Sequence, residues 1–244
     1  MITFDPIREF NQTFQLRELT AGETIQISMI PKEQEERRLT KMLNFVLDGK
    51  YDARLLTVQQ RYFLLLKYLE KQDGTLLEVD AHTKNHLSKY MYPSSNRSTW
   101  NTEITQGTIT VRQLTGREAE YIERICKSVQ EKLIALMAFQ YRDTESKHQL
   151  FKTYITDNLT DAQYDVEMNK RFKQILNLPS SEHQILYSRY ALLNHSLNTH
   201  LNFYMSTLGF VLSKTDGGTD DAPTRFCTSD AFSRIFAELD GNIT

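Results

Sequence analysis

The chain has 244 residues, and its 29 basic and 31 acidic side chains nearly cancel. This balance excludes a global electrostatic attraction to nucleic acid or to an anionic membrane. Two cysteines far apart in the sequence exclude a disulfide framework, and the apolar runs are too short to span a bilayer. The first ten residues lack the basic start and apolar run of a signal peptide, so we expect a soluble protein made in the cytoplasm.

The first predicted elements are two short strands and a helix. Residues 13–19 and 24–30 are expected to pair around Ala21-Gly22, since the second run alternates apolar and polar side chains. Pro31 and the following glutamates then predict a helix start, and Asp48-Gly49 predicts its end.

A second helix is expected to begin at Thr57, because Gln60 three residues later completes a capping box. It continues as "RYFLLLKYLEKQ", which is apolar around most of its circumference and therefore predicts a buried helix. A strand, "TLLEV", should follow the Asp73-Gly74 turn.

Residues 81–103 are expected to form a long irregular loop. From Ala81 to Thr102 the loop has no acidic side chain, and it carries the basic and aromatic residues Lys84, Lys89, Arg97, Tyr90, Tyr92 and Trp100. Tyr, Trp and Arg with few acids are typical of protein interface cores, and basic groups among aromatics are also typical of sites that bind single-stranded nucleic acid. Because three positive charges are few, protein docking is the favoured interpretation.

A second strand-to-helix unit follows. Ile109 and Val111 alternate as in a strand, and Thr115 with Glu118 forms another capping box. The helix is expected to run on through Leu136. Two more helices are predicted at about 144–157 and 160–177, the second ended by Leu178-Pro179.

Residues 180–214 predict one long amphipathic helix. Its apolar seam has spacings of three and four and consists of Leu186, Tyr190, Leu193, Leu197, Leu201, Tyr204, Leu208 and Val211. The acidic stretch "TDGGTDDAPT" after it predicts a flexible linker, followed by a short helix capped by Ser229 or Asp230.

These elements predict an α+β fold that is predominantly α-helical, with two short strand-to-helix units and a long amphipathic C-terminal helix. The expected division is an N-terminal strand–helix unit with a helical hairpin (1–80), the long loop (81–103), a second strand–helix unit with a helical bundle (104–213) and an acidic tail (214–244).

No residue pattern predicts catalysis. The common phosphate-binding, hydrolase and zinc-protease motifs do not occur. His82 and His86 lie four apart, but no further ligands at a fitting spacing complete a zinc site, so solvated loop histidines are favoured. Cys126 falls on an apolar helix stripe, which favours a core residue, and Cys227 has no histidine beside it. We therefore expect no catalytic residue, cofactor or metal.

Two phrases of the sequence share one pattern: "GETIQISMIPKEQEERRL" (22–39) and "GTITVRQLTGREAEYIERI" (107–125). The first, through Gly22, Ile25, Ile27, Ile30, Pro31 and Glu33, and the second, through Leu114, Thr115, Gly116, Arg117 and Glu118, resemble small baseplate and tail-hub proteins of contractile-tailed bacteriophages. The resemblance covers about a third of the chain and implies a structural role in the virion without catalysis. The long loop and the acidic tail depart from the family's pattern.

The expected function is therefore that of a structural subunit of a phage tail baseplate or hub, located in the virion and docked on other tail proteins in a hetero-oligomeric assembly. The residues expected to bind partners are Tyr90, Tyr92, Arg97 and Trp100 of the loop and Leu193, Leu197, Leu201 and Tyr204 of the seam. Two alternatives remain: a tail-assembly chaperone left out of the particle, and a single-stranded nucleic-acid-binding module that uses residues 81–102. Nucleic acid is the less favoured partner, and no membrane partner is expected.

Overall fold

The computed structural model describes residues 2–73, 76–80, 83–94, 100–156, 158–215 and 223–231, with the backbone alone at 73, 76–80 and 83–86. Within these residues the chain forms seven α-helices, three short 3-10 helices and four small antiparallel sheets, so helix and strand are mixed as in an α+β fold. One contiguous apolar cluster reaches from Phe4 to Ala231.

The N-terminal segment differs from the predicted strand pair. Strands β1 (Ile7–Glu9) and β2 (Gln12–Phe14) form a hairpin, and residues of the expected second strand belong to helix α1 (Ala21–Ser28). The prediction of a strand over 24–30 is wrong because Thr20 and Glu23 form a capping box, with hydrogen bonds between each side chain and the other residue's N–H group. Ile27 is buried, whereas Ile25 and Met29 are exposed.

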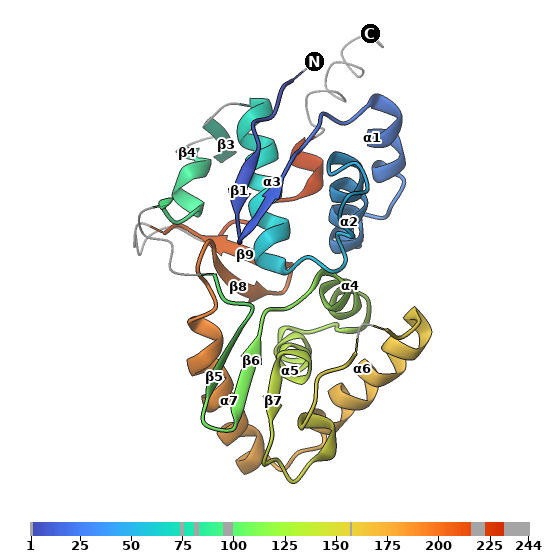
Figure 1. The fold of residues 1–244 in the computed structure, drawn as a ribbon, viewed down its shortest axis with the longest axis vertical. Coiled ribbons are helices and arrows are strands. Elements are labelled where there is room, and N and C mark those ends of the chain that lie inside the picture. The colour runs from blue at the N-terminus through green and yellow to red at the C-terminus, as the bar shows by residue number, and fades with distance from the viewer. Residues whose placement is uncertain are drawn as a thin grey trace.

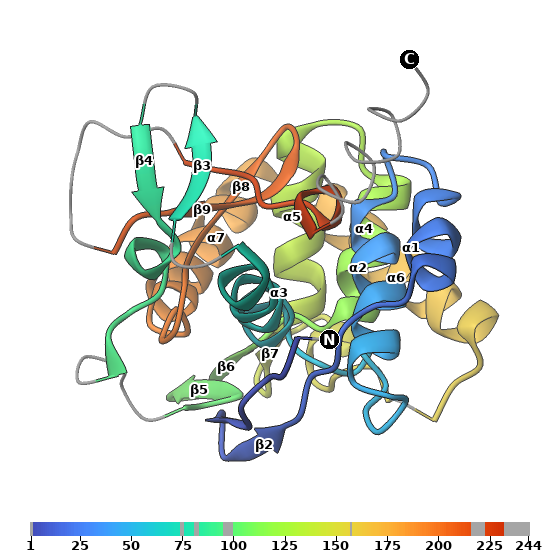
Figure 2. The same cartoon turned by 90° about the horizontal axis from the view of Figure 1, so that it is seen from above.

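The next two helices are confirmed, although the first of them starts at Glu35 and not at Pro31. Helix α2 (Glu35–Val46) ends before Asp48 and Gly49, both of which have positive φ angles. Helix α3 (Val58–Asp73) begins at the expected Thr57–Gln60 capping box. The two views place α3 in the middle of its half of the molecule, between α1–α2 and β3–β4 (Figures 1 and 2). Seven of its apolar and aromatic side chains are at most 1% exposed: Tyr62, Phe63, Leu64, Leu65, Leu66, Tyr68 and Leu69.

The segment expected to be an irregular loop has regular structure in its first part. Strand β3 (Leu76–Asp80) pairs with β4 (Thr83–His86), and a 3-10 helix, η1 (Leu87–Tyr90), follows. In the remainder of 81–103, Met91 forms an isolated bridge with Leu201, and β5 (Glu103–Gln106) begins at its end.

A three-stranded sheet organises the other half of the molecule, with the order β5, β6 (Ile109–Arg112) and β7 (Tyr141–Asp143). The predicted strand at Ile109 and the helix after Thr115 are confirmed, the latter as α4 (Gly116–Ile125). The expected continuation of this helix to Leu136 is wrong. Cys126 has an extended backbone, and Ser128 with Glu131 caps a separate helix, α5 (Val129–Gln140).

The predicted helix over 144–157 is also wrong, because that segment contains only the 3-10 helix η3 (Gln149–Phe151) in its described part. The helix predicted at 160–177 is confirmed as α6 (Asp161–Leu176), with a capping box of Thr160 and Gln163. Helix α7 (Ser180–His195) packs against β5 and β6, whereas α5 and α6 pack against each other.

The long C-terminal helix is not present. Helix α7 stops at His195, and the chain continues as the hairpin of β8 (Asn202–Ser206) and β9 (Gly209–Ser213). The turn between helix and hairpin is buried, since the Gln59 side-chain oxygen accepts from the N–H groups of His200 and Leu201. These tertiary bonds fix an extended backbone where a helix was expected.

The segment expected to be an acidic tail is packed against the core where it is described. Thr224 bridges to Leu212 of β9, Phe226 is 1% exposed, and the 3-10 helix η4 (Thr228–Ala231) contacts α2 and α3. The expected short helix starting near Ser229 is confirmed only as η4, and residues 216–222 and 232–244 lie outside the described residues.

Candidate functional site

The residues predicted to bind partners do not share one surface. Tyr90, Leu193, Leu197 and Leu201 are at most 7% exposed, whereas Tyr204 is 49% exposed. Tyr92 and Trp100 are half-buried, and Arg97 lies outside the described residues. The seam is divided among α7, the turn after it and β8, so it presents no continuous helix face.

The described aromatic rings of the long loop pack within their own chain. The Tyr90 ring meets Phe226 edge to face at 4.9 Å, and its hydroxyl lies 3.0 Å from Thr224 Oγ1. The Trp100 ring meets Phe10 at 4.7 Å between ring centres. These contacts give the two side chains a role in the core.

Helix α7 and the β8–β9 hairpin enclose a groove of about 330 Å³, which we call the amide groove. The described lining has amides, apolar or aromatic groups and one histidine, but no Asp, Glu, Lys or Arg; it is formed by Val58, Gln59, Gln113, Leu114, Leu133, Leu136, Gln140, Tyr187, Tyr190, Ala191, Asn194, His195, Leu197, Asn198, Phe203, Tyr204, Met205 and Phe210. Three residues of the predicted seam line it: Tyr190, Leu197 and Tyr204.

Hydrogen bonds hold the amides of the groove in place. The Gln140 amide nitrogen donates to Arg112 O at 2.7 Å, and its oxygen accepts from the Tyr190 hydroxyl at 2.7 Å. The Gln113 amide donates to Leu197 O at 2.7 Å. Because these hydrogen bonds fix the orientation of the two amides, the groove has polar groups at fixed positions among apolar side chains.

Exposed apolar side chains lie at the rim of the amide groove and beside it. Tyr187 and Tyr204 are 43% and 49% exposed at the rim. Ile185 and Leu192, seven residues apart on the outer side of α7, are 55% and 65% exposed. Amphipathic aromatic groups around a groove are typical of protein interfaces.

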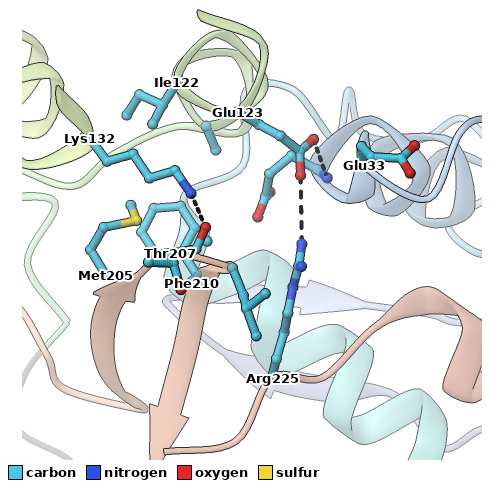
Figure 3. A pocket seen from close by; sticks show the side chains of 12 residues that line it. Glu33, Ile122, Glu123, Lys132, Met205, Thr207, Phe210 and Arg225 are labelled. Carbon is cyan, nitrogen blue, oxygen red and sulfur yellow. Dashed lines mark hydrogen bonds and ion pairs between the residues drawn. The ribbon is translucent and has the colours of Figure 1, made fainter. Parts of the chain in front are cut away.

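A second cavity of about 220 Å³ lies where α2, α4, α5, the β8–β9 turn and residues 223–227 meet (Figure 3). We call it the Glu123 pocket; it is lined by Glu33, Glu36, Ala119, Ile122, Glu123, Lys132, Met205, Thr207, Leu208, Gly209, Phe210 and Arg225. No sequence motif predicted that these residues form one pocket, because elements distant in the chain supply them.

Glu123 joins three elements at this pocket. Its Oε2 accepts the N–H of Glu36 at 2.9 Å, at the start of α2. Its Oε1 lies 3.7 Å from Arg225 Nη2 (Figure 3). Burial, and next the neighbouring Glu36 carboxylate, raise the pKa of Glu123 to about 8. The side chain can therefore take up or release a proton near neutral pH.

Glu36, which lines the pocket, belongs to a buried ion pair with Arg61. Arg61 is fully buried, and its Nη2 lies 3.0 Å from Glu36 Oε2 and 2.7 Å from Glu36 O. The Tyr62 hydroxyl donates to the second carboxylate oxygen of Glu36 at 2.7 Å. The negative charge of Glu36 is thus matched by its own partners.

The thiols and histidines singled out in the sequence form no site among the described residues. Cys126 is buried, and burial raises the pKa of its thiol to about 11; burial raises that of Cys227 to about 12. His82 lies outside the described residues, as does the His86 side chain. In the part of the chain that the structure describes, no three His, Cys, Asp or Glu side chains come together as metal ligands.

No protein-family model matches the chain. No curated protein and no solved structure is similar enough to match it either. None of the described helices has the length and apolar character needed to cross a membrane.

Proposed function

We propose that the chain acts by docking onto other proteins through the amide groove and the outer side of α7. The observation that carries the proposal is the uncharged groove of about 330 Å³ with Tyr187 and Tyr204 exposed at its rim. Because the lining has no Asp, Glu, Lys or Arg, the occupant is a segment of a partner protein that inserts an uncharged aromatic or aliphatic side chain.

The assembly proposed for this docking is the tail baseplate or hub of a bacteriophage, with the chain as a structural subunit in the virion. The sequence resemblance motivates this choice. In the structure its second phrase is a strand-to-helix corner between β6 and α4, whereas its first phrase contains helix α1, so the resemblance between the two phrases does not extend to their structures. The proposal therefore depends mainly on the second phrase and on the exposed groove.

The composition of purified particles tests the phage assignment. We expect mass spectrometry to find the chain in virions of the phage that encodes it, and light scattering to find it in complexes with other tail proteins. A chain that co-purifies with immature tails but is missing from virions is instead an assembly chaperone. Absence from both, with no tail genes beside its gene, would contradict both phage roles.

Substitutions at the rim test the groove itself. Tyr187→Ser combined with Tyr204→Ser should lower the recovery of partner complexes at least tenfold, because exposed tyrosines contribute a large share of binding energy. Val166→Ser, at a 53% exposed apolar position on α6, is the matched control and should leave recovery unchanged. Equal recovery of the double variant and the control would place the docking surface elsewhere.

A further inference from the structure

The Glu123 pocket has two chemically different walls. Ala119 and Ile122 of α4 face Met205 and Phe210 of the hairpin across an apolar region. The side chain of Lys132 runs between these groups toward Thr207, and Glu123 and Arg225 lie beyond it (Figure 3). A ligand that fits both walls needs an apolar body and a polar head.

The positive charges of Lys132 and Arg225 in the pocket are not fully neutralised by neighbouring carboxylates. The Lys132 ammonium donates to the main-chain oxygens of Thr207 at 2.7 Å and Ser206 at 3.4 Å, and no described carboxylate forms an ion pair with it. Arg225 lies beyond hydrogen-bond distance of Glu123, and its buried Nε has no hydrogen-bond partner among the described residues. Burial, and then Arg225, lower the pKa of Lys132, so the two cations destabilise each other.

The acidic side chains of the pocket do not neutralise the positive charges of Lys132 and Arg225 at neutral pH. The Glu36 carboxylate already has Arg61 and Tyr62 as partners, and Glu33 is exposed. Because its pKa is raised to about 8, Glu123 is mostly protonated at pH 7. In that form it adds no charge and has an O–H group that can donate a hydrogen bond.

We propose that the Glu123 pocket binds a small carboxylate that carries an apolar group. The carboxylate lies between Lys132 and Arg225, with protonated Glu123 as a further donor. The apolar group packs against Ile122, Met205 and Phe210. A volume of about 220 Å³ is below the usual range for drug-sized ligands, which sets the ligand at roughly ten non-hydrogen atoms.

This site is separate from the proposed docking surface, because Glu123, Lys132 and Arg225 do not line the amide groove. The two cavities share only Met205 and Phe210 of the hairpin. The groove is uncharged, whereas the pocket has charged groups from several elements. Loss of docking in the rim variants therefore does not imply loss of carboxylate binding, and either proposal can fail alone.

The test compares three probes of similar shape and different charge: benzoate, benzylamine and benzamide. At pH 7 and constant ionic strength, we expect benzoate to cause saturable NMR shifts in the pocket amides and to bind at least tenfold more tightly than the other two. Lys132→Met and Arg225→Met should each weaken benzoate binding at least tenfold. Lys127→Met is the control, since it removes the same charge from an exposed side chain outside the pocket.

The pH dependence of binding gives a second readout. The charged groups around Glu123 come from α2 and the turn before it, from α5 and from the C-terminal segment; they are Glu33, Glu35, Glu36, Lys132 and Arg225. Between pH 7 and pH 9, benzoate binding should weaken more in the wild type, where Glu123 ionises, than in Glu123→Gln, because loss of the Lys132 proton affects both proteins alike. Preferential binding of benzylamine, equal effects of Lys132→Met and Lys127→Met, or no saturable shift with benzoate would each overturn the proposal.

Discussion

Gly116 shows how a single residue joins the capped starts of α3 and α4. Its N–H donates to Leu56 O at 2.9 Å, next to a bridge between Thr57 and Thr115. A Cβ on Gly116 would lie 1.9 Å from Arg61 Nη1 and 2.8 Å from the main-chain oxygen of Ala53. The absence of a side chain at this position is what lets the Arg61 guanidinium reach Glu36 under the pocket.

We expect Gly116→Ala to lower the free energy of unfolding by about 2–4 kcal/mol, since it displaces a buried charge from its partner. Urea denaturation measures the change. Gly22→Ala is the control, because Gly22 lies inside α1 and a Cβ there meets nothing within 4 Å; it should stabilise by up to about 1 kcal/mol. Equal stability of the two variants would show that Arg61 adapts without cost.

At the scale of elements, capping boxes in the sequence predicted where helices start, whereas apolar alternation did not predict which strands pair. The capping boxes at Thr57 and Thr115 predicted α3 and α4 correctly. The same signal is present at Thr20–Glu23 and Ser128–Glu131, but the alternation of apolar side chains after Thr20 indicated a strand instead. A two-residue period over so few residues does not separate a strand from a half-exposed helix.

The C-terminal part shows why the rest could not be predicted. Apolar spacings of three and four continue past His195, so the sequence pattern does not mark the end of α7. The structural signal is tertiary, since Gln59 binds the backbone at His200 and Leu201 from 141 and 142 residues away. Likewise, Glu123 and Glu36 meet across 87 residues, and no local pattern reveals that contact.

Leu197 tests whether the turn after α7 is buried in the core. It is 1% exposed in the turn after α7, whereas Leu192 on the helix is 65% exposed. We expect Leu197→Asp to lower the free energy of unfolding by about 3 kcal/mol or more, because it buries an unpaired carboxylate. Thermal and urea denaturation measure the loss.

Leu192→Asp is the matched substitution and should change stability by less than about 1 kcal/mol. If the seam belonged to one helix with a single buried face, the two substitutions would still differ, but the NMR shifts of residues 196–201 would remain helical. We expect instead that the NMR chemical shifts of residues 198–201 are those of extended or turn backbone.

At the scale of the whole molecule, carboxylates hold the described C-terminal segment and the start of α2 together. Glu35 accepts the Thr228 N–H, and Glu123 accepts the Glu36 N–H beside Arg225. Burial raises the pKa of Glu35 and of Asp230 as well as that of Glu123. The junction between α2, α4 and this segment therefore favours protonated carboxyl groups, which links the stability of the fold to pH.

The sign of this linkage follows from Glu123. Its pKa is about 4.5 in the unfolded chain and about 8 in the fold, so between these values the folded state binds more protons. Stability contributed by this group is complete below about pH 4.5 and is lost as the pH rises through 8.

Glu123→Gln keeps an oxygen that can accept the Glu36 N–H but removes the titration. The variant should thus gain about 1–3 kcal/mol over the wild type at pH 9, and little at pH 5. Urea denaturation at both pH values measures the difference between the two proteins, in which the contributions of Glu35 and Asp230 cancel to first order. A constant difference would mean that Glu123 stays ionised in the fold, and its bond to α2 would then act as an ordinary charged helix cap.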